Sequence, residues 1–142
     1  MTSQSVQGSR ELGDILTEMT FEFFGSGQHK ISLDPLLSKS GAVILDVRSS
    51  EEVQTLSLPR SGDMTVLHIP TNEIPDRFSE IPTDRPVAVF CSAGIRAAIV
   101  YAYLRTLGFE RVRILKGGLA DLAEQAKPGK LWKRLGDRGQ SS

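Results

Sequence analysis

The stretch Val87-Ala88-Val89-Phe90-Cys91-Ser92-Ala93-Gly94-Ile95-Arg96 decides the fold of this chain. Its first four residues are apolar, which predicts a buried strand over 87–90. A short turn follows Cys91, and the helix predicted after it ends before Gly108, because glycine is common where helices end. The apolar positions that recur there at helical spacing are Ile95, Ile99, Ala102 and Tyr103, with Ala98 and Leu107 alongside. Cys91 is therefore predicted to stand between the carboxyl end of a strand and the start of a helix.

The turn after the strand combines three features that activate a thiol. The first N–H groups of a helix are unpaired, and the helix dipole adds partial positive charge there. Gly94 allows several N–H groups to turn inward, and Arg96 adds a full positive charge. Thiols in such settings have pKa values of about 3.5 to 7.5, and the thiolate is the nucleophile. Cys91 is thus predicted to be a catalytic nucleophile, and the anion-binding loop beside it is Ser92, Ala93, Gly94, Ile95 and Arg96.

Length and composition are those of one ordinary globular domain. The chain has 142 residues, of which 39% are hydrophobic and 24% charged. Lys and Arg together number 17, as do Asp and Glu, so no basic excess predicts binding to nucleic acid or to an anionic membrane. The single cysteine excludes an internal disulfide, and His29 and His68 lie far apart, so no metal site is expected. No apolar run approaches the length of a membrane span and the polar N-terminus has no signal-peptide core, which predicts a cytoplasmic protein.

Three parts are predicted to follow one another along the chain. Residues 1–27 form an N-terminal extension, disordered over 1–9 and then an amphipathic helix over 11–24. The helix either packs on the domain or offers a surface to a partner or a second copy. Residues 28–126 form the domain, and 127–142 form a basic tail that is expected to be solvated. The helix side chains predicted to share one face are Leu12, Ile15, Leu16, Met19 and Phe23.

Strands alternate with helices at short intervals in the predicted domain. Strands are expected at 29–31, 42–47, 65–69, 87–90 and 112–115. A loop is expected over 57–64 and a helix over 119–126. The other helix starts are expected at capping residues, namely Asp34 before Pro35, Ser49 with Glu52 as a capping box, and Asn72. The alternation predicts an α/β fold with a parallel sheet and helices on both faces, and ligands of such sheets bind beyond the carboxyl ends of the strands.

Four stretches in this order resemble the single-domain rhodaneses. They are Ile44-Leu45-Asp46-Val47-Arg48 with Glu51-Glu52, Ile69-Pro70 with Glu73-Ile74-Pro75, the loop from Cys91 to Arg96, and Gly108-Phe109 to Leu115-Lys116-Gly117-Gly118. The resemblance covers about residues 28 to 126 and implies a five-stranded parallel sheet flanked by helices. The sequence departs from the family pattern in two places. It lacks the usual Gly-His-Ile-Pro-Gly-Ala segment, having 56–62 instead, and Leu122 stands near the position of a common Trp.

The resemblance implies sulfur transfer. Rhodaneses carry sulfane sulfur as a cysteine persulfide, so Cys91 is expected to take the outer sulfur of a donor and pass it to a thiol or to cyanide. The implied partners are a small-molecule sulfur donor, such as thiosulfate or glutathione persulfide, or a protein that carries a persulfide. No cofactor is implied. The N–H groups of residues 92–96 are expected to hold the anionic sulfur.

Three charged residues have expected roles that support this loop. Arg96 either binds the sulfonate end of thiosulfate or braces the loop by hydrogen bonding to carbonyl groups. Asp46, at the end of a neighbouring strand, is expected to accept hydrogen bonds that brace the loop. Arg48 is expected to form an ion pair with Glu51 or Glu52.

Other interpretations of the cysteine remain open. A lone cysteine after an apolar strand is often a small buried side chain without chemistry. A rhodanese-like interaction module without catalysis is a second alternative, because the helix over 11–24 suits a partner. A cysteine phosphatase or arsenate reductase is the third. Tyrosine phosphatases carry the string His-Cys-Ser-Ala-Gly-Ile-Gly-Arg, but here Phe90 replaces the His and four residues, not five, separate Cys91 from Arg96. The shorter loop favours a single sulfur over a tetrahedral phosphate.

Overall fold

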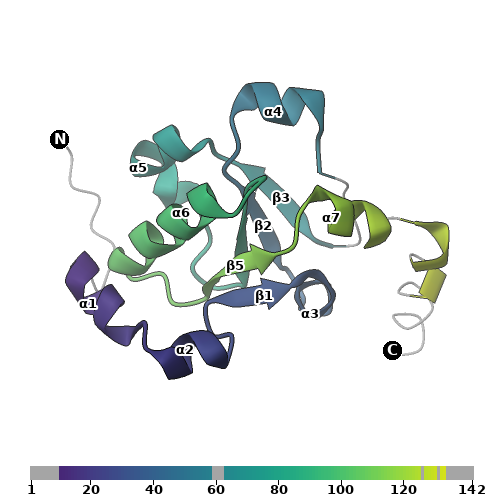
Figure 1. The fold of residues 1–142 in the computed structure, drawn as a ribbon. Helices are drawn as coiled ribbons and strands as arrows, with labels where there is room; N and C mark the ends of the chain where they lie inside the picture. Colours follow the sequence, from purple (N-terminus) through teal and green to yellow (C-terminus); the bar gives the residue numbers. More distant parts are fainter. Residues whose placement is uncertain (1–9, 59–62, 126, 131, 134–142) are drawn as a thin grey trace.

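The computed structural model describes residues 10–58, 63–125, 127–130 and 132–133, and a five-stranded sheet forms its centre (Figure 1). The strands lie in the order β1-β5-β4-β2-β3, and every neighbouring pair is parallel. The predicted α/β fold with about five parallel strands is therefore confirmed. The strands are β1 Lys30–Ser32, β2 Val43–Asp46, β3 Thr65–His68, β4 Val87–Phe90 and β5 Val112–Lys116.

Strands β2 and β4 lie side by side inside the sheet, and every residue of both is buried. Burial on both faces explains why their sequences are almost wholly apolar. The register pairs Asp46 with Phe90 and, on the other side, with His68. The three strands therefore end level with one another. The residues that follow β2 and β4 meet at this carboxyl edge, and Cys91 is among them.

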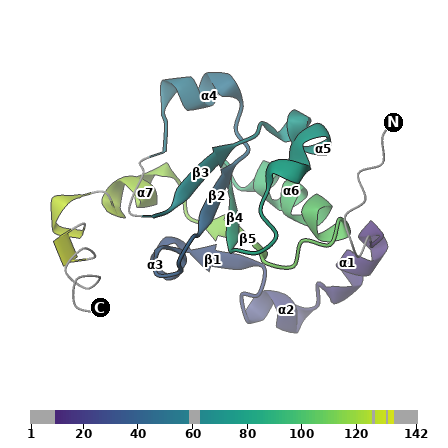
Figure 2. The same ribbon diagram turned by 180° about the vertical axis from the view of Figure 1, so that it is seen from behind.

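Helices cover both faces of the sheet, as predicted (Figure 1, Figure 2). On one face, Val43 and Leu45 belong to the same core as Ile74 of α5 and Leu104 of α6. On the other face, Ile44 shares a core with α3, and α7 packs against it through its first residue. The helices are α3 Leu33–Leu37, α4 Ser50–Thr55, α5 Ile74–Arg77, α6 Ile95–Thr106 and α7 Leu119–Gln125, with 3-10 turns at Thr71–Glu73 and Phe78–Glu80.

Helix α6 faces the sheet with a different side from the one predicted. Ile95 and Ile99 are 71% and 61% exposed, so the expected apolar face points to solvent at its N-terminal end. The buried positions are Ala97, Val100, Tyr101 and Leu104. The helix has apolar residues on both stripes, so spacing alone does not choose between them. The small side chain at position 97 fits the close approach of the helix start to the end of β4.

The predicted single helix over 11–24 is wrong, because two short helices occupy this segment: α1 Leu12–Glu18 and α2 Phe21–Gly25. Met19 leaves the helical conformation, and the side chain of Thr20 caps α2 by accepting a hydrogen bond from the N–H of Phe23. The segment packs on the domain, which was one of the two alternatives. Ile15 is buried, whereas Leu12 and Leu16 of the expected face are about half exposed.

Of the three predicted helix caps, one is confirmed and two are wrong. Ser49 and Glu52 form the predicted capping box at the start of α4. Asp34 is not an N-cap, because α3 begins two residues earlier than predicted, at Leu33, with Ser32 as its N-cap. Asn72 lies inside a 3-10 turn. Residues 1–9, 59–62 and most of the tail after 130 lie outside the described residues, and the predictions of disorder, loop and solvated end fall largely there. None of the described helices is long and apolar enough to cross a membrane.

Candidate functional site

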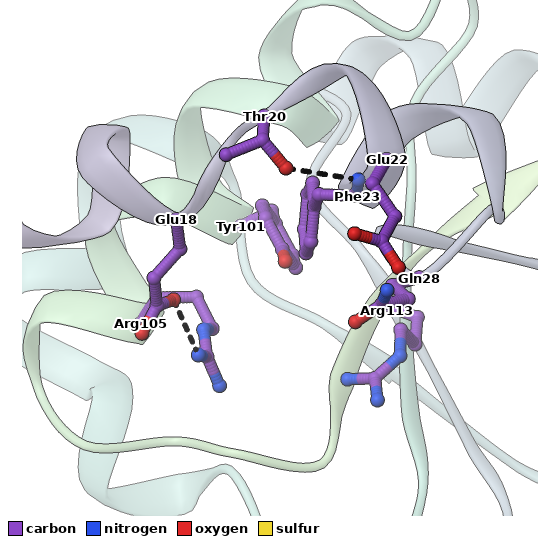
Figure 3. A pocket seen from close by; sticks show the side chains of 8 residues that line it. All are labelled: Glu18, Thr20, Glu22, Phe23, Gln28, Tyr101, Arg105 and Arg113. Atoms are coloured by element: carbon purple, nitrogen blue, oxygen red, sulfur yellow. Dashed lines mark hydrogen bonds and ion pairs between the residues drawn. The ribbon is translucent and has the colours of Figure 1, made fainter.

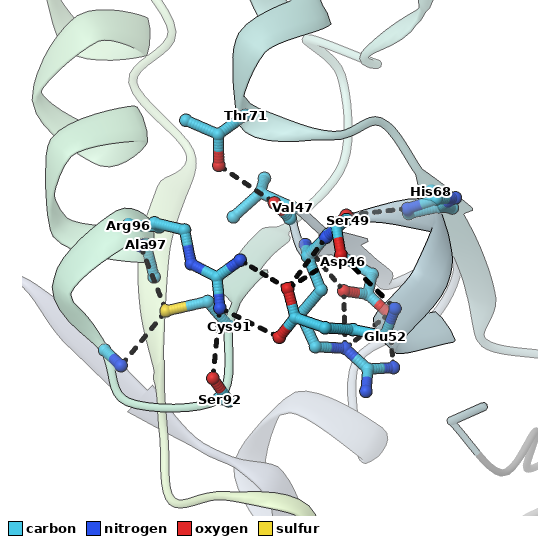
Figure 4. Close-up of polar contacts among 12 residues, drawn as sticks. Asp46, Val47, Ser49, Glu52, His68, Thr71, Cys91, Ser92, Arg96 and Ala97 are labelled. Carbon is cyan, nitrogen blue, oxygen red and sulfur yellow. Dashed lines mark hydrogen bonds and ion pairs between the residues drawn. The ribbon is translucent and has the colours of Figure 1, made fainter. Parts of the chain in front are cut away.

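Cys91 lies at the base of a loop that aims backbone N–H groups at its sulfur. The N–H of Gly94 donates to Cys91 Sγ at 3.0 Å and the N–H of Ala97 donates at 3.3 Å (Figure 4). Cys91 is 4% exposed, whereas residues 92–95 form an exposed rim around it. Gly94 makes this turn with φ +87°, a left-handed conformation that other residues rarely adopt. The turn and the helix start together form a cradle for negative charge on sulfur.

The cradle extends one residue beyond the predicted loop of 92–96. Ala97 is the third residue of α6, since Gly94 is the N-cap and Ile95 the first helical residue. The first N–H groups of any helix lack partners within the helix. A helix starting at Ile95 was predicted, so this rule could have identified the N–H of Ala97 as a donor.

Arg96 braces the loop, but its partners are a carboxylate and a hydroxyl rather than the expected carbonyl groups (Figure 4). Its Nη1 donates to Glu52 Oε1 at 2.6 Å and its Nη2 to Glu52 Oε2 at 3.0 Å. Nη2 also donates to Ser92 Oγ at 3.0 Å. The arginine therefore links the two ends of the loop to helix α4, which is distant in sequence.

Glu52 is the ion-pair partner of Arg96, whereas the sequence predicted that Glu52 or Glu51 pairs with Arg48. Its carboxylate also accepts hydrogen bonds from the N–H and hydroxyl of Ser49. The Arg96 hydrogen bond, followed by that of Ser49, lowers the pKa of Glu52 to about 2. The same contact raises the pKa of Arg96, with a smaller contribution from the nearby Cys91. Glu52 thus carries a full negative charge beside the cradle.

Asp46 and Arg48 form a buried ion pair, so the predicted pairing of Arg48 with Glu51 or Glu52 is wrong. Arg48 Nε donates to Asp46 Oδ1 at 3.0 Å, and Nη2 donates to Oδ2 at 2.8 Å. Both side chains are almost completely buried, and the guanidinium lies over the ring of Phe90. Asp46 also accepts a hydrogen bond from the N–H of Arg48. The hydrogen bonds described for its carboxylate thus come from Arg48, and none comes from the Cys91 loop that it was expected to brace. The pair holds the chain at the end of β2, from which α4 begins.

A hollow lies near the C-terminal end of α6, away from the predicted site residues (Figure 3). It has a volume of about 490 Å³ and lies between α1, α2, α6 and β5. Arg105 Nη2 donates to Glu18 Oε2 there at 3.1 Å, and burial raises the pKa of Tyr101. The residues that line it are Glu18, Thr20, Glu22, Phe23, Gln28, Tyr101, Arg105 and Arg113.

Comparison with known proteins identifies the family. The model of the rhodanese-like domain matches residues 32–125. This chain belongs to the rhodanese-like domain family. It is 33% identical over 93 residues to a protein named sulfurtransferase from Allochromatium vinosum, a match that covers 66% of this chain and 82% of that protein. The fold resembles a rhodanese-like domain protein from Staphylococcus aureus, with a TM-score of 0.55 and 27% identity over 66% of this chain and 89% of the other.

This chain is also similar to part of a longer protein. A tRNA sulfurtransferase from Histophilus somni is 34% identical over 73 residues, which is 51% of this chain but 15% of that protein. Cys91 and its cradle lie inside the matched domain of this chain, whereas α1 and α2 precede it. The resemblance predicted from the sequence is thus confirmed at the level of family and fold.

Proposed function

We propose that this rhodanese-like protein transfers sulfane sulfur through a persulfide on Cys91. The observation that carries this proposal is the pair of backbone N–H groups, from Gly94 and Ala97, that point at Cys91 Sγ. Such donors stabilise negative charge on sulfur, both in the attacking thiolate and in the persulfide it becomes. They are part of the folded backbone, so they require no reorganisation during the reaction. In addition, relatives named sulfurtransferases support sulfur transfer for the family.

The first half of the reaction loads the cysteine. The Cys91 thiolate attacks the outer sulfur of the donor, and a new bond forms between Sγ and that sulfur. The S–S or S–SO₃ bond of the donor breaks, and its electron pair leaves with the remaining thiolate or with sulfite. No general base is required if the thiol is already ionised.

The second half returns the enzyme to its starting state. An acceptor, either a thiolate or cyanide, attacks the terminal sulfur of the persulfide. The bond between the two sulfurs breaks, and its electron pair returns to Cys91 Sγ. With cyanide the product is thiocyanate, and with a thiolate it is a new persulfide. A protein partner that carries a persulfide remains part of the proposal as a donor or acceptor.

Two other functions are less well supported. A purely structural module gains nothing from two N–H groups aimed at a buried sulfur, although α1 and α2 still offer an exposed apolar surface. A phosphatase needs a loop that surrounds a tetrahedral phosphate. Here Arg96 is bonded to Glu52, and a carboxylate in that position repels phosphate.

Intact-protein mass spectrometry tests the proposal directly. After incubation with thiosulfate and removal of the excess, the wild type is expected to gain the mass of one sulfur, and cyanide should remove it. Cys91→Ser should gain no sulfur and form no thiocyanate while unfolding at the wild-type temperature. Thiocyanate production by Cys91→Ser at the wild-type rate contradicts the proposal. The same is true of a wild type that gains no sulfur from thiosulfate, a thiosulfonate or a persulfide.

A further inference from the structure

The positive charge of Arg96 is already neutralised by Glu52 before any sulfur donor binds. Three hydrogen bonds from its two terminal nitrogens go to Glu52 and Ser92, at 2.6, 3.0 and 3.0 Å. The fork of N–H groups that binds the two oxygens of Glu52 is the same fork that an arginine uses to bind a sulfonate. A sulfonate at this position must therefore displace the carboxylate or approach a pair with no net charge.

We propose that Glu52 is a specificity-determining residue, which makes the Cys91 site prefer sulfur donors of low negative charge to the thiosulfate dianion. This inference rests on the proposed persulfide chemistry of Cys91. It assigns Arg96 to positioning the loop rather than to binding a sulfonate, the two roles that the sequence left open. Glu52 acts through charge, since it does not contact the sulfur that reacts.

The surroundings of the cradle support this assignment. Among the described residues at this edge, the other arginine is Arg48, and it is paired with Asp46 at 2.8 Å. Glu51 is exposed in the first turn of α4 and adds a further carboxylate. Glu52 is also ionised at neutral pH, because the hydrogen bond from Arg96 lowers its pKa to about 2. Within the described part of this edge, a dianion thus finds both guanidiniums already paired with carboxylates, and Glu51 adds a negative charge in the same turn of α4 as Glu52.

Two donors that differ mainly in charge test the inference. Thiosulfate carries two negative charges, and the methanethiosulfonate anion, CH₃SO₂S⁻, carries one. In both, Cys91 takes the outer sulfur as a new S–S bond forms. The S–S bond of the donor breaks, and its electron pair leaves with sulfite or with methanesulfinate. The ratio of the two loading rates, measured by intact mass in single-turnover experiments, cancels general damage to the site.

Glu52→Gln is the informative variant, because it changes charge while keeping the local fold. Glutamine at the third helical position still supports a capping box with Ser49. The matched control is Glu51→Gln, which removes one charge from the same turn of α4 but has no ion pair with Arg96 among the described contacts. A double variant, Glu52→Gln with Arg96→Ala, removes the guanidinium that the first substitution frees.

We expect Glu52→Gln to raise the ratio of thiosulfate loading to methanethiosulfonate loading roughly tenfold, as one unit charge at close range predicts. Glu51→Gln should change the ratio much less, and the double variant should lose the gain. Added salt should reduce the gain, because it screens charge. If Glu52→Gln loads both donors with the wild-type ratio, this inference is wrong and the persulfide mechanism stands. If the wild type takes sulfur from neither of these donors, the inference fails, and the proposed function fails as well when a persulfide donor also leaves no sulfur on Cys91.

Discussion

The two ends of helix α6 carry the same kind of ion pair in two different settings. Arg96, in the first turn, is bonded to Glu52 of α4, and Arg105, in the last turn, is bonded to Glu18 of α1 (Figure 4, Figure 3). The two arginines are nine positions apart, which corresponds to about 14 Å of helix. The first pair lies beside the Cys91 cradle, and the second lines the hollow under the N-terminal helices. The geometry of an arginine–glutamate ion pair therefore does not by itself define a role. The residues that surround the pair decide what it can do.

The two regions also differ in how they are anchored. At the cradle, the partly exposed pair of Arg96 and Glu52 stands next to a buried one, Asp46 with Arg48, whose side chains are 1% and 2% exposed. At the other end, Glu18 is 39% exposed and also bonds Arg10. Buried pairs are costly to break from one side, whereas exposed pairs contribute little to stability. We therefore expect substitutions at the carboxyl edge to have larger effects than substitutions in the N-terminal hollow.

The largest effect on stability is expected from Asp46→Ala. It leaves the Arg48 guanidinium buried without its carboxylate, and removing one partner of a buried pair costs about 3–5 kcal/mol. Chemical denaturation monitored by circular dichroism measures the loss. The double variant Asp46→Val with Arg48→Met removes both charges, so it should recover most of the lost stability. A single variant within about 1 kcal/mol of the wild type contradicts the buried-pair argument.

Gly94→Ala is expected to have the next largest effect on stability. It also tests whether the backbone conformation of this turn controls the rate at which Cys91 takes up sulfur. A side chain at φ +87° costs about 1–2 kcal/mol, and no atom lies close enough to clash with the added carbon. If the turn relaxes, the Gly94 N–H moves away from Cys91, and sulfur loading should slow by about one to two orders of magnitude.

Gly41→Ala is the matched control for this substitution. Gly41 also has positive φ, +69°, and open space around it, but it lies at the opposite edge of the sheet, before β2. It should lose similar stability and load sulfur at the wild-type rate. If sulfur loading slows equally in both variants, the cause is general destabilisation, and the role proposed for the Gly94 N–H is wrong.

The sequence was sufficient to predict the carboxyl edge, because its signals are local. Apolar runs mark β2 and β4, and a glycine and an arginine after Cys91 mark the turn and helix start. Asp46 was expected to accept hydrogen bonds that brace the Cys91 loop, but those described for it come from Arg48, two residues away. Local patterns report local geometry, and the cradle is built from residues 91–97.

The wrong predictions concern contacts that depend on burial or on residues distant in sequence. Glu52 meets Arg96 across 44 positions, and Arg48, predicted to pair with Glu51 or Glu52, is instead paired with the buried Asp46. The rotation of α6 was misjudged because apolar residues lie on both of its stripes, so the sheet, not the pattern, selects the buried one. The N-terminal helix breaks at Thr20, whose capping hydrogen bond competes with continued helix.

The ionisation of Glu18 and Glu52 provides a further comparison of the two ends of α6. Hydrogen bonds from arginine lower the pKa of both, for Glu52 to about 2. A carboxyl with a lowered pKa stabilises the fold above its unfolded value, near 4.5, and loses this contribution as pH falls toward the folded value. The side-chain carboxyl carbon of Glu52 should therefore show no NMR titration between pH 9 and 4. In Arg96→Ala its midpoint should rise. A Glu52 midpoint near 4.5 in the wild type contradicts the ion pair.

The smallest effect is expected from Glu18→Gln, in the hollow at the far end of α6. It removes a partly exposed ion pair with Arg105 and Arg10, so the free energy of unfolding should fall by at most about 1 kcal/mol. Sulfur loading of Cys91 should remain at the wild-type rate, because roughly 14 Å of helix separates the two pairs and salt screens exposed charges over this distance.

Glu22→Gln is the control for this substitution. It lines the same hollow and has no ion-pair partner among the described residues, so its stability should not change. Slower sulfur loading in Glu18→Gln, with stability intact, contradicts this separation. It shows that the N-terminal helices act on the cradle through α6.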